Sequence, residues 1–181
     1  MTRHEYEQYF TSIATGEIKT PPYDDFLYFD YTKLNASRYQ RWIKKGRLDN
    51  TLIEVVKQTT FIHWTVITEP WCGDAAHSVP FIALLAQVNP AINLNIELRD
   101  SAPFTIDRYL TNGTKSIPVF IFSDGVTEKI WGPRPQELAD IFKSLENKDL
   151  SFDEKKLELQ KWYNKDEGKS LQKEILEILS L

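Results

Sequence analysis

The sequence predicts an α/β fold, in which a mixed central sheet is flanked by helices and a helical extension lies at each end of the chain. Two observations carry this prediction. Residues 61–68 and 92–98 have strand character and are separated by a helical segment, which indicates parallel strands joined by a right-handed crossover. Asp124-Gly125 separates two further short strands, and this dipeptide is typical of an antiparallel hairpin.

The central region, residues 51–147, has the element order α-β-α-β-α-β-β-α. Residues 61–68 are β-branched and aromatic, which favours a strand. Apolar and polar residues alternate over 92–98, the period of a half-buried strand. Residues 72–88 are apolar on most sides and predict a well-covered helix. The remaining expected elements are short helices over 51–58 and 103–110, hairpin strands over 119–123 and 126–131, and a last helix that starts near Pro135.

Both ends of the chain predict helices. Residues 1–50 form a helical arm, in which a short amphipathic helix ends at Gly16 and a second helix covers about 31–45. Residues 148–181 form a helical extension interrupted at Gly168. Its apolar faces need a partner, and we expect the N-terminal arm or one side of the sheet to supply it. A dimer interface is the less favoured alternative.

The composition and charge of the chain limit the classes of function that it can have. The chain has 181 residues, 41% of them hydrophobic, and a net charge of −4, which disfavours nucleic acid and anionic membrane as partners. No apolar run approaches the roughly 20 residues that span a bilayer, and the N-terminus lacks the apolar segment of a signal peptide. Cys72 is the single cysteine. It excludes an intrachain disulfide and a cysteine-based zinc site and favours the reducing cytoplasm, so we expect no metal and no cofactor.

Residues 51–147 resemble the thioredoxin family at points that follow one another in the family's order and spacing. They are the Trp71-Cys72-Gly73 loop between a strand and a helix, Pro80 within that helix, the Ile117-Pro118 step, Gly125 in the hairpin and Gly132 after it. The resemblance implies a thioredoxin-like fold with a cis proline at 118 that faces the active-site sulfur. Thr68 to Asp74 and Trp131 to Pro135 are similar to a bacterial branch of thioredoxin-like proteins, which implies a fold but little settled function.

Two departures from the family decide the expected chemistry. Ala75 stands where the family has its second cysteine, and Val66 stands where thioredoxins carry a buried acid. The resemblance therefore does not extend to a dithiol reductase. It predicts single-cysteine thiol–disulfide exchange, in which Cys72 attacks a mixed disulfide and a low-molecular-weight thiol releases it. The expected partner is a disulfide-containing protein or such a thiol.

Two other functions stay open. A redox-inactive module would bind an extended peptide or partner protein along the backbone beside Pro118. A monothiol glutaredoxin-type cluster carrier is weaker, because the Cys-Gly-Phe-Ser loop of that family is not matched. The helix N-terminus lowers the pKa of Cys72 by well under one unit, about 0.3–1 kcal/mol, whereas Asp74 and Glu69 oppose its ionisation.

The residues around Cys72 have competing interpretations. Trp71 either lines a substrate groove or covers the thiol, and Trp131 and Arg134 either extend that groove or, for Arg134, provide a surface charge. Asp74 either sets substrate charge or stabilises the first helical turn. His77 lies about 140° around the helix from Cys72, which disfavours a Cys–His dyad.

Overall fold

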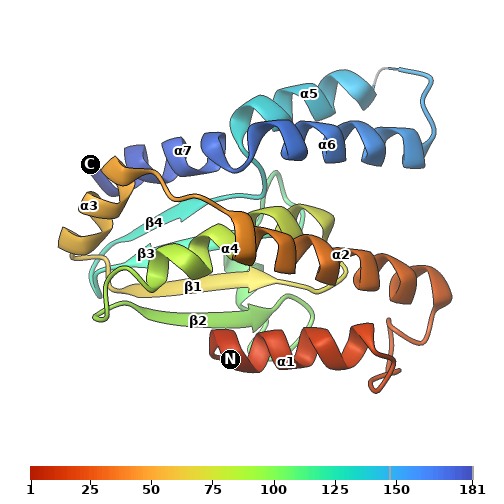
Figure 1. Ribbon diagram of the computed structural model, residues 1–181, viewed down its shortest axis with the longest axis horizontal. Coiled ribbons are helices and arrows are strands. Elements are labelled where there is room, and N and C mark those ends of the chain that lie inside the picture. The colour runs from red at the N-terminus through yellow and green to blue at the C-terminus, as the bar shows by residue number, and fades with distance from the viewer. Residues whose placement is uncertain (147, 181) are drawn as a thin grey trace.

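The computed structural model describes residues 1–146 and 148–180. Its centre is a four-stranded mixed sheet in the order β2-β1-β3-β4 (Figure 1). Strand β1 (His63–Thr68) pairs in parallel with β2 (Asn93–Leu98), and β3 (Val119–Ser123) is antiparallel to both β1 and β4 (Glu128–Trp131). The mixed sheet and its flanking helices confirm the predicted fold class. The expected boundary at residue 147 and the last residue, 181, lie outside the described residues.

Seven α-helices occur in the described residues. They are α1 (Arg3–Ala14), α2 (Phe26–Lys45), α3 (Asn50–Gln58), α4 (Gly73–Ala86), α5 (Gln136–Glu146), α6 (Phe152–Asp166) and α7 (Lys169–Ser180). None of them is both long enough and apolar enough to cross a membrane. Helix α4 is buried on nearly all sides, as its apolar sequence predicts.

Local capping explains where several elements differ from the sequence prediction. Helix α2 begins at Phe26, earlier than expected, because the Asp25 carboxylate accepts the backbone N–H groups of Leu27 and Tyr28. Strand β4 begins later than expected, because the Asp124 side chain holds residues 126 and 127 in the hairpin turn.

The helix expected over 103–110 is wrong. This segment contains only a 3₁₀ turn, η1 (Thr105–Arg108). The residue before the turn, Phe104, has φ of 58°, in the left-handed region where a right-handed helix cannot continue.

The helices form layers around the sheet (Figure 1). Helix α2 lies along α4, and α1 packs against both α2 and β2. At the opposite edge, α7 packs against α3 and β4, and the Lys129 Nζ donates to the carbonyl of Ile178 at 2.8 Å. The edge strand β4 is therefore covered by α7. Helix α6 leads into α7 and pairs with α5. Tyr163 of α6 contacts Asp74 and His77, so α6 lies near the N-terminal end of α4, against which α2 also packs.

The junction between α6 and α7 depends on Gly168. Its φ is +78°, and a Cβ at this position would collide with the buried ring of Phe81 in α4. Gly113 has nearly the same φ, +77°, but no atom lies within 4 Å of the corresponding Cβ position. Comparing the same substitution at the two glycines therefore distinguishes the cost of backbone strain from the cost of steric overlap.

We predict that Gly168→Ala lowers the free energy of unfolding by about 2–5 kcal/mol, because overpacking adds to the cost of a positive φ. Gly113→Ala is the matched control and should cost roughly 1–2 kcal/mol. Urea denaturation measures both values. Equal losses in the two variants would show that the Phe81 contact does not fix the junction.

Candidate functional site

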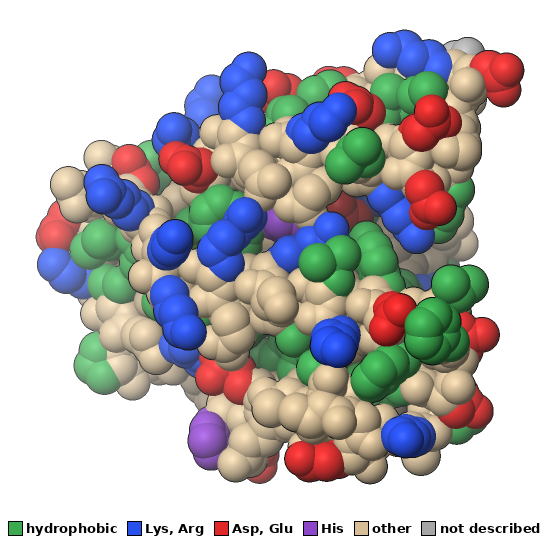
Figure 2. Space-filling view, turned by 45° about the vertical axis from the view of Figure 1, so that its right-hand side comes forward, with side chains coloured by type: hydrophobic (Ala, Val, Ile, Leu, Met, Phe, Trp, Pro, Cys, Tyr) green, Lys and Arg blue, Asp and Glu red, His purple; other side chains and the backbone are tan. Residues whose placement is uncertain are grey.

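The Trp71-Cys72-Gly73 loop lies in a pocket of about 720 Å³. The N-terminal end of α4, helices α2, α5 and α6, and residues 99, 114–117 and 133–134 contribute to its lining. Figure 2 shows lysine, arginine and hydrophobic side chains next to one another around the hollowed part of this face. The two helical extensions therefore supply much of the wall around the loop.

Cys72 is the N-cap of α4 and is almost fully buried, with 6% of its surface exposed. Its S–H donates to the carbonyl oxygen of Ile117 at 3.3 Å, and Sγ accepts the backbone N–H of Ala75 at 3.4 Å. Burial, followed by the negative charge of Asp74, raises the pKa of the Cys72 thiol to about 12. The thiol is consequently protonated at neutral pH, since the Ala75 N–H does not offset desolvation.

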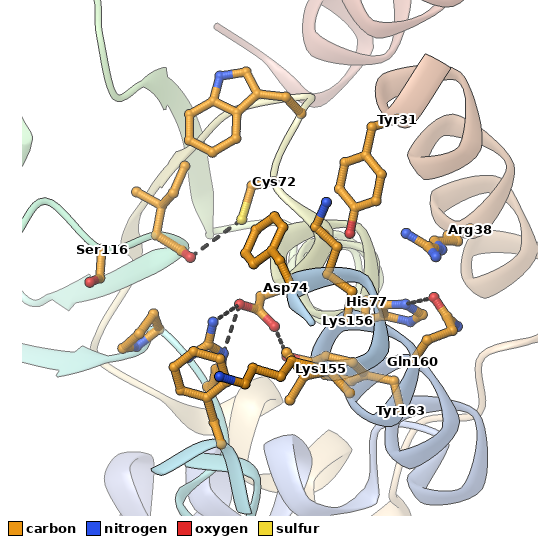
Figure 3. A pocket seen from close by; sticks show the side chains of 18 of the residues that line it. Tyr31, Arg38, Cys72, Asp74, His77, Ser116, Lys155, Lys156, Gln160 and Tyr163 are labelled. Carbon is orange, nitrogen blue, oxygen red and sulfur yellow. Dashed lines mark hydrogen bonds and ion pairs between the residues drawn. The ribbon is translucent and has the colours of Figure 1, made fainter. Parts of the chain in front are cut away.

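Asp74 connects three parts of the site (Figure 3). Its Oδ2 accepts Nε of Arg134 at 2.8 Å and pairs with Nη2 at 2.7 Å, and its Oδ1 accepts the Tyr163 hydroxyl at 2.9 Å. Asp74 therefore holds the loop after β4 and helix α6 against the start of α4. This role is broader than that of a first-turn acid stabilising its own helix.

Close backbone packing brings Arg134 to the pocket. A Cβ on Gly132 would collide with the carbonyl oxygen of Pro118, and the φ of Gly132, +133°, also favours glycine. The Ile117–Pro118 peptide bond is cis. The loops before β3 and after β4 thus lie against each other, with Ile117 and Arg134 both lining the pocket.

Six of the nine residues expected at the loop or groove line the pocket, namely Trp71, Cys72, Gly73, Asp74, Ile117 and Arg134. Ala75 and Pro118 are not among the lining residues, although Ala75 donates to the Cys72 sulfur. Trp131 does not extend the groove. Its buried ring stacks on Phe120 with centroids 4.9 Å apart, and its Nε1 donates to Glu174 of α7.

Other lining residues were missed by the sequence prediction because they belong to the extensions. The main ones are Tyr31 and Arg38 from α2, and Lys155, Lys156, Gln160 and Tyr163 from α6. Gly73 is the one residue of the loop whose identity relates to these side chains. A Cβ at this position would lie 2.6 Å from the Tyr31 hydroxyl oxygen, so the glycine leaves room for Tyr31 beside the loop. No pattern in the sequence predicts that the remaining residues of α2 and α6 reach the pocket.

His77 lines the pocket and joins the helices that surround it. Its Nδ1 accepts Nε1–H of Trp42 from α2 at 2.8 Å, so the proton lies on Nε2, which faces Oε1 of Gln160 at 3.1 Å. Its ring stacks on Tyr163 of α6 at 4.3 Å. Burial lowers the pKa of His77 to about 3, so the ring is neutral and serves packing rather than a dyad with Cys72.

The structure contains no candidate metal centre in residues 1–146 and 148–180, where no three His, Cys, Asp or Glu side chains are grouped suitably.

We predict that Asp74→Asn increases the reactivity of Cys72. It removes a negative charge that raises the thiol pKa and releases Arg134, whose positive charge favours the thiolate. A drop of about one pKa unit would raise the alkylation rate at pH 9 roughly tenfold. Iodoacetamide labelling followed by mass spectrometry measures this rate. Tyr163→Phe, which keeps the charge of Asp74, is the control, and an unchanged rate in Asp74→Asn would refute the coupling.

We predict that His77 destabilises the fold in acid. Below pH 6.5 the unfolded chain binds a proton at this residue, whereas the folded chain does not until about pH 3. Stability is therefore lost as pH falls through this window, by about 1.4 kcal/mol per pH unit from this group. Urea denaturation of His77→Gln between pH 6.5 and 4 should give a shallower dependence than the wild type. The exposed His63, changed to Gln, should keep the wild-type slope, and identical slopes in all three proteins would contradict the assignment.

Comparisons with known proteins address the fold and family. The family described as Thioredoxin matches residues 22–151. A crystal structure of a protein of unknown function from Pseudomonas aeruginosa is similar, with a TM-score of 0.57 and 17% identity, over 83% of this chain and 84% of that one. A search of curated proteins found no match. The solved structure supports the fold alone, whereas the family match covers most of the sequence: the chain belongs to the thioredoxin family.

Proposed function

We propose that this chain is a ligand-binding module of the thioredoxin family, in which a small molecule occupies the pocket beside Cys72 and the thiol is chemically quiet at neutral pH. The observation that carries the proposal is the state of Cys72. Its sulfur is buried and its proton is donated to the Ile117 carbonyl. With a pKa of about 12, the thiolate is a very small fraction of the population at pH 7.

The pocket favours a small ligand over an extended peptide. A peptide that pairs with the chain beside Pro118 needs exposed backbone groups there, but Ile117 is buried, with 6% of its surface exposed. Helices α2 and α6 both contribute to the wall around this step. The cavity volume, about 720 Å³, lies in the range of small-molecule sites, roughly 300–1,000 Å³.

Single-cysteine exchange is the second candidate, because the sulfur lines the pocket and the Ala75 N–H points at it. In this reaction the Cys72 thiolate attacks one sulfur of a mixed disulfide, and the other sulfur leaves as a thiolate. A low-molecular-weight thiolate then attacks the Cys72 adduct, which restores Cys72 and forms a new disulfide. The reaction ranks second because its first step requires a thiolate, and therefore the loss of the proton that Cys72 retains.

The pH dependence of iodoacetamide alkylation separates the two candidates. We predict slow labelling from pH 7 to 9, roughly several thousand-fold below a cysteine peptide with its pKa near 8.5 at pH 7 and roughly several hundred-fold below it at pH 9, and a rate that still rises at pH 11. Cys72→Ser should give no labelling and shows that the signal comes from this thiol. A half-maximal rate below pH 8.5 would overturn the quiet thiol and place exchange first.

A further inference from the structure

Positive charge dominates the pocket. Six cationic side chains line it and one carboxylate, Asp74, does so. The cations are Arg38, Arg99, Lys115, Arg134, Lys155 and Lys156. The whole chain has a net charge of −4, so this excess is local and opposite in sign to that of the molecule.

Three of these cations already have a close carboxylate. Arg134 pairs with Asp74 inside the pocket. Arg99 pairs with Asp100 at 2.7 Å, and Lys115 pairs with Asp107 at 2.6 Å. The excess charge that a ligand would meet therefore comes mainly from Arg38, Lys155 and Lys156.

These three cations lack strong compensation. Arg38 donates to the uncharged amide oxygen of Asn35 at 2.8 Å. In the described part of the chain, no carboxylate lies within 4.0 Å of Arg38 or Lys155. Lys156 is 3.7 Å from Asp153, whose side chain is 92% exposed, and such a pair is weakened by solvent.

Two of the cations converge on one aromatic ring. The guanidinium carbon of Arg38 lies 5.4 Å from the ring centre of Tyr31, and Nζ of Lys156 lies 4.6 Å from the same point. The sum of these distances, 10.0 Å, is the most that can separate the two charges. Figure 3 shows Tyr31 and Arg38 from α2 near Lys156 from α6. Two positive charges within 10.0 Å of each other create a local positive potential that favours a nearby anion.

Apolar side chains lie in the same pocket. Leu27 and Phe152 line it, yet they are 76% and 72% exposed, and Tyr28 packs against Trp71 with ring centres 6.0 Å apart. A purely inorganic anion would leave these surfaces in water. A ligand with an aromatic or aliphatic body would cover them.

We infer that the pocket binds an organic anion, with a phosphate or carboxylate group attracted by the uncompensated charges of Arg38, Lys155 and Lys156 and an apolar body against the aromatic and aliphatic lining. This inference rests on the proposed function, because it names the ligand class of the same pocket.

Two dyes of matched shape test the inference. Anilinonaphthalene sulfonate carries one negative charge, and N-phenyl-1-naphthylamine is its neutral analogue. We expect the wild type to bind the sulfonate at least tenfold more tightly, as measured by fluorescence titration in low salt. The variant Arg38→Gln/Lys155→Gln/Lys156→Gln should lose at least tenfold in affinity for the sulfonate. Its affinity for the neutral dye should change less than twofold.

The matched control is Lys33→Gln/Lys161→Gln/Lys165→Gln. It makes the same change in net charge at exposed positions, one on α2 and two on α6, outside the pocket lining. This variant should keep wild-type affinity for the sulfonate. Two results would overturn the anion site while leaving a small-molecule pocket. One is an equal loss of sulfonate affinity in both triple variants, and the other is equal affinity of the wild type for the two dyes. If neither dye binds the wild type, the proposed function fails as well.

Competition identifies the anionic group. Displacement of the sulfonate dye by inorganic pyrophosphate alone would assign the site to phosphates, and displacement by citrate alone would assign it to carboxylates. Either result supports the shared chemistry. If millimolar concentrations of both leave the dye bound, the anion site is refuted.

Discussion

The arrangement of the pocket depends on the contacts of one buried side chain, the imidazole of His77. It receives a hydrogen bond from Trp42 of α2, faces Gln160 of α6 and stacks on Tyr163 of the same helix. A single side chain of α4 thus fixes both extensions against the helix that begins at Cys72. Such a contact requires a neutral ring, because a charged imidazolium could not accept the Trp42 N–H. The walls of the pocket and the uncharged state of His77 are therefore two consequences of the same packing.

The same burial determines the state of the thiol. The N-terminus of α4 favours an anion by about 0.3–1 kcal/mol. A pKa that rises from 9.0 to about 12 corresponds to roughly 4 kcal/mol in the opposite direction. Desolvation outweighs the helix terminus because the loop is enclosed rather than facing solvent. Asp74 adds to the shift, and its charge is only partly offset by Arg134, which it holds in place.

Local sequence features predict the framework of the site but not its walls. The period-two pattern of residues 92–98 and the Asp124-Gly125 turn are local signals, and they predict the sheet correctly. Cys72 and Gly73 lie next to each other in sequence and reach the pocket together.

The positions of three of the lining cations depend instead on how the helical extensions pack against the sheet domain. These cations are Arg38, Lys155 and Lys156. Long-range packing determines their positions, and no local sequence pattern predicts it. Trp131 lies outside the pocket lining for a related reason. Strand pairing sets it opposite Phe120, on which its ring stacks, and α7 supplies the partner for its indole N–H.

Charge also links ligand binding to the chemistry of Cys72. A cation near the loop favours a thiolate as well as a bound anion, as Arg134 does for Cys72, so a thiolate and an anionic ligand compete for positive charge. An anion held near the loop stabilises the neutral thiol, and by reciprocity a thiolate weakens the binding of that anion. Tight binding of an anionic ligand and activation of Cys72 thus oppose each other in this geometry. A site that retains both the cations and a buried, protonated thiol is more consistent with holding an anion than with attacking a disulfide.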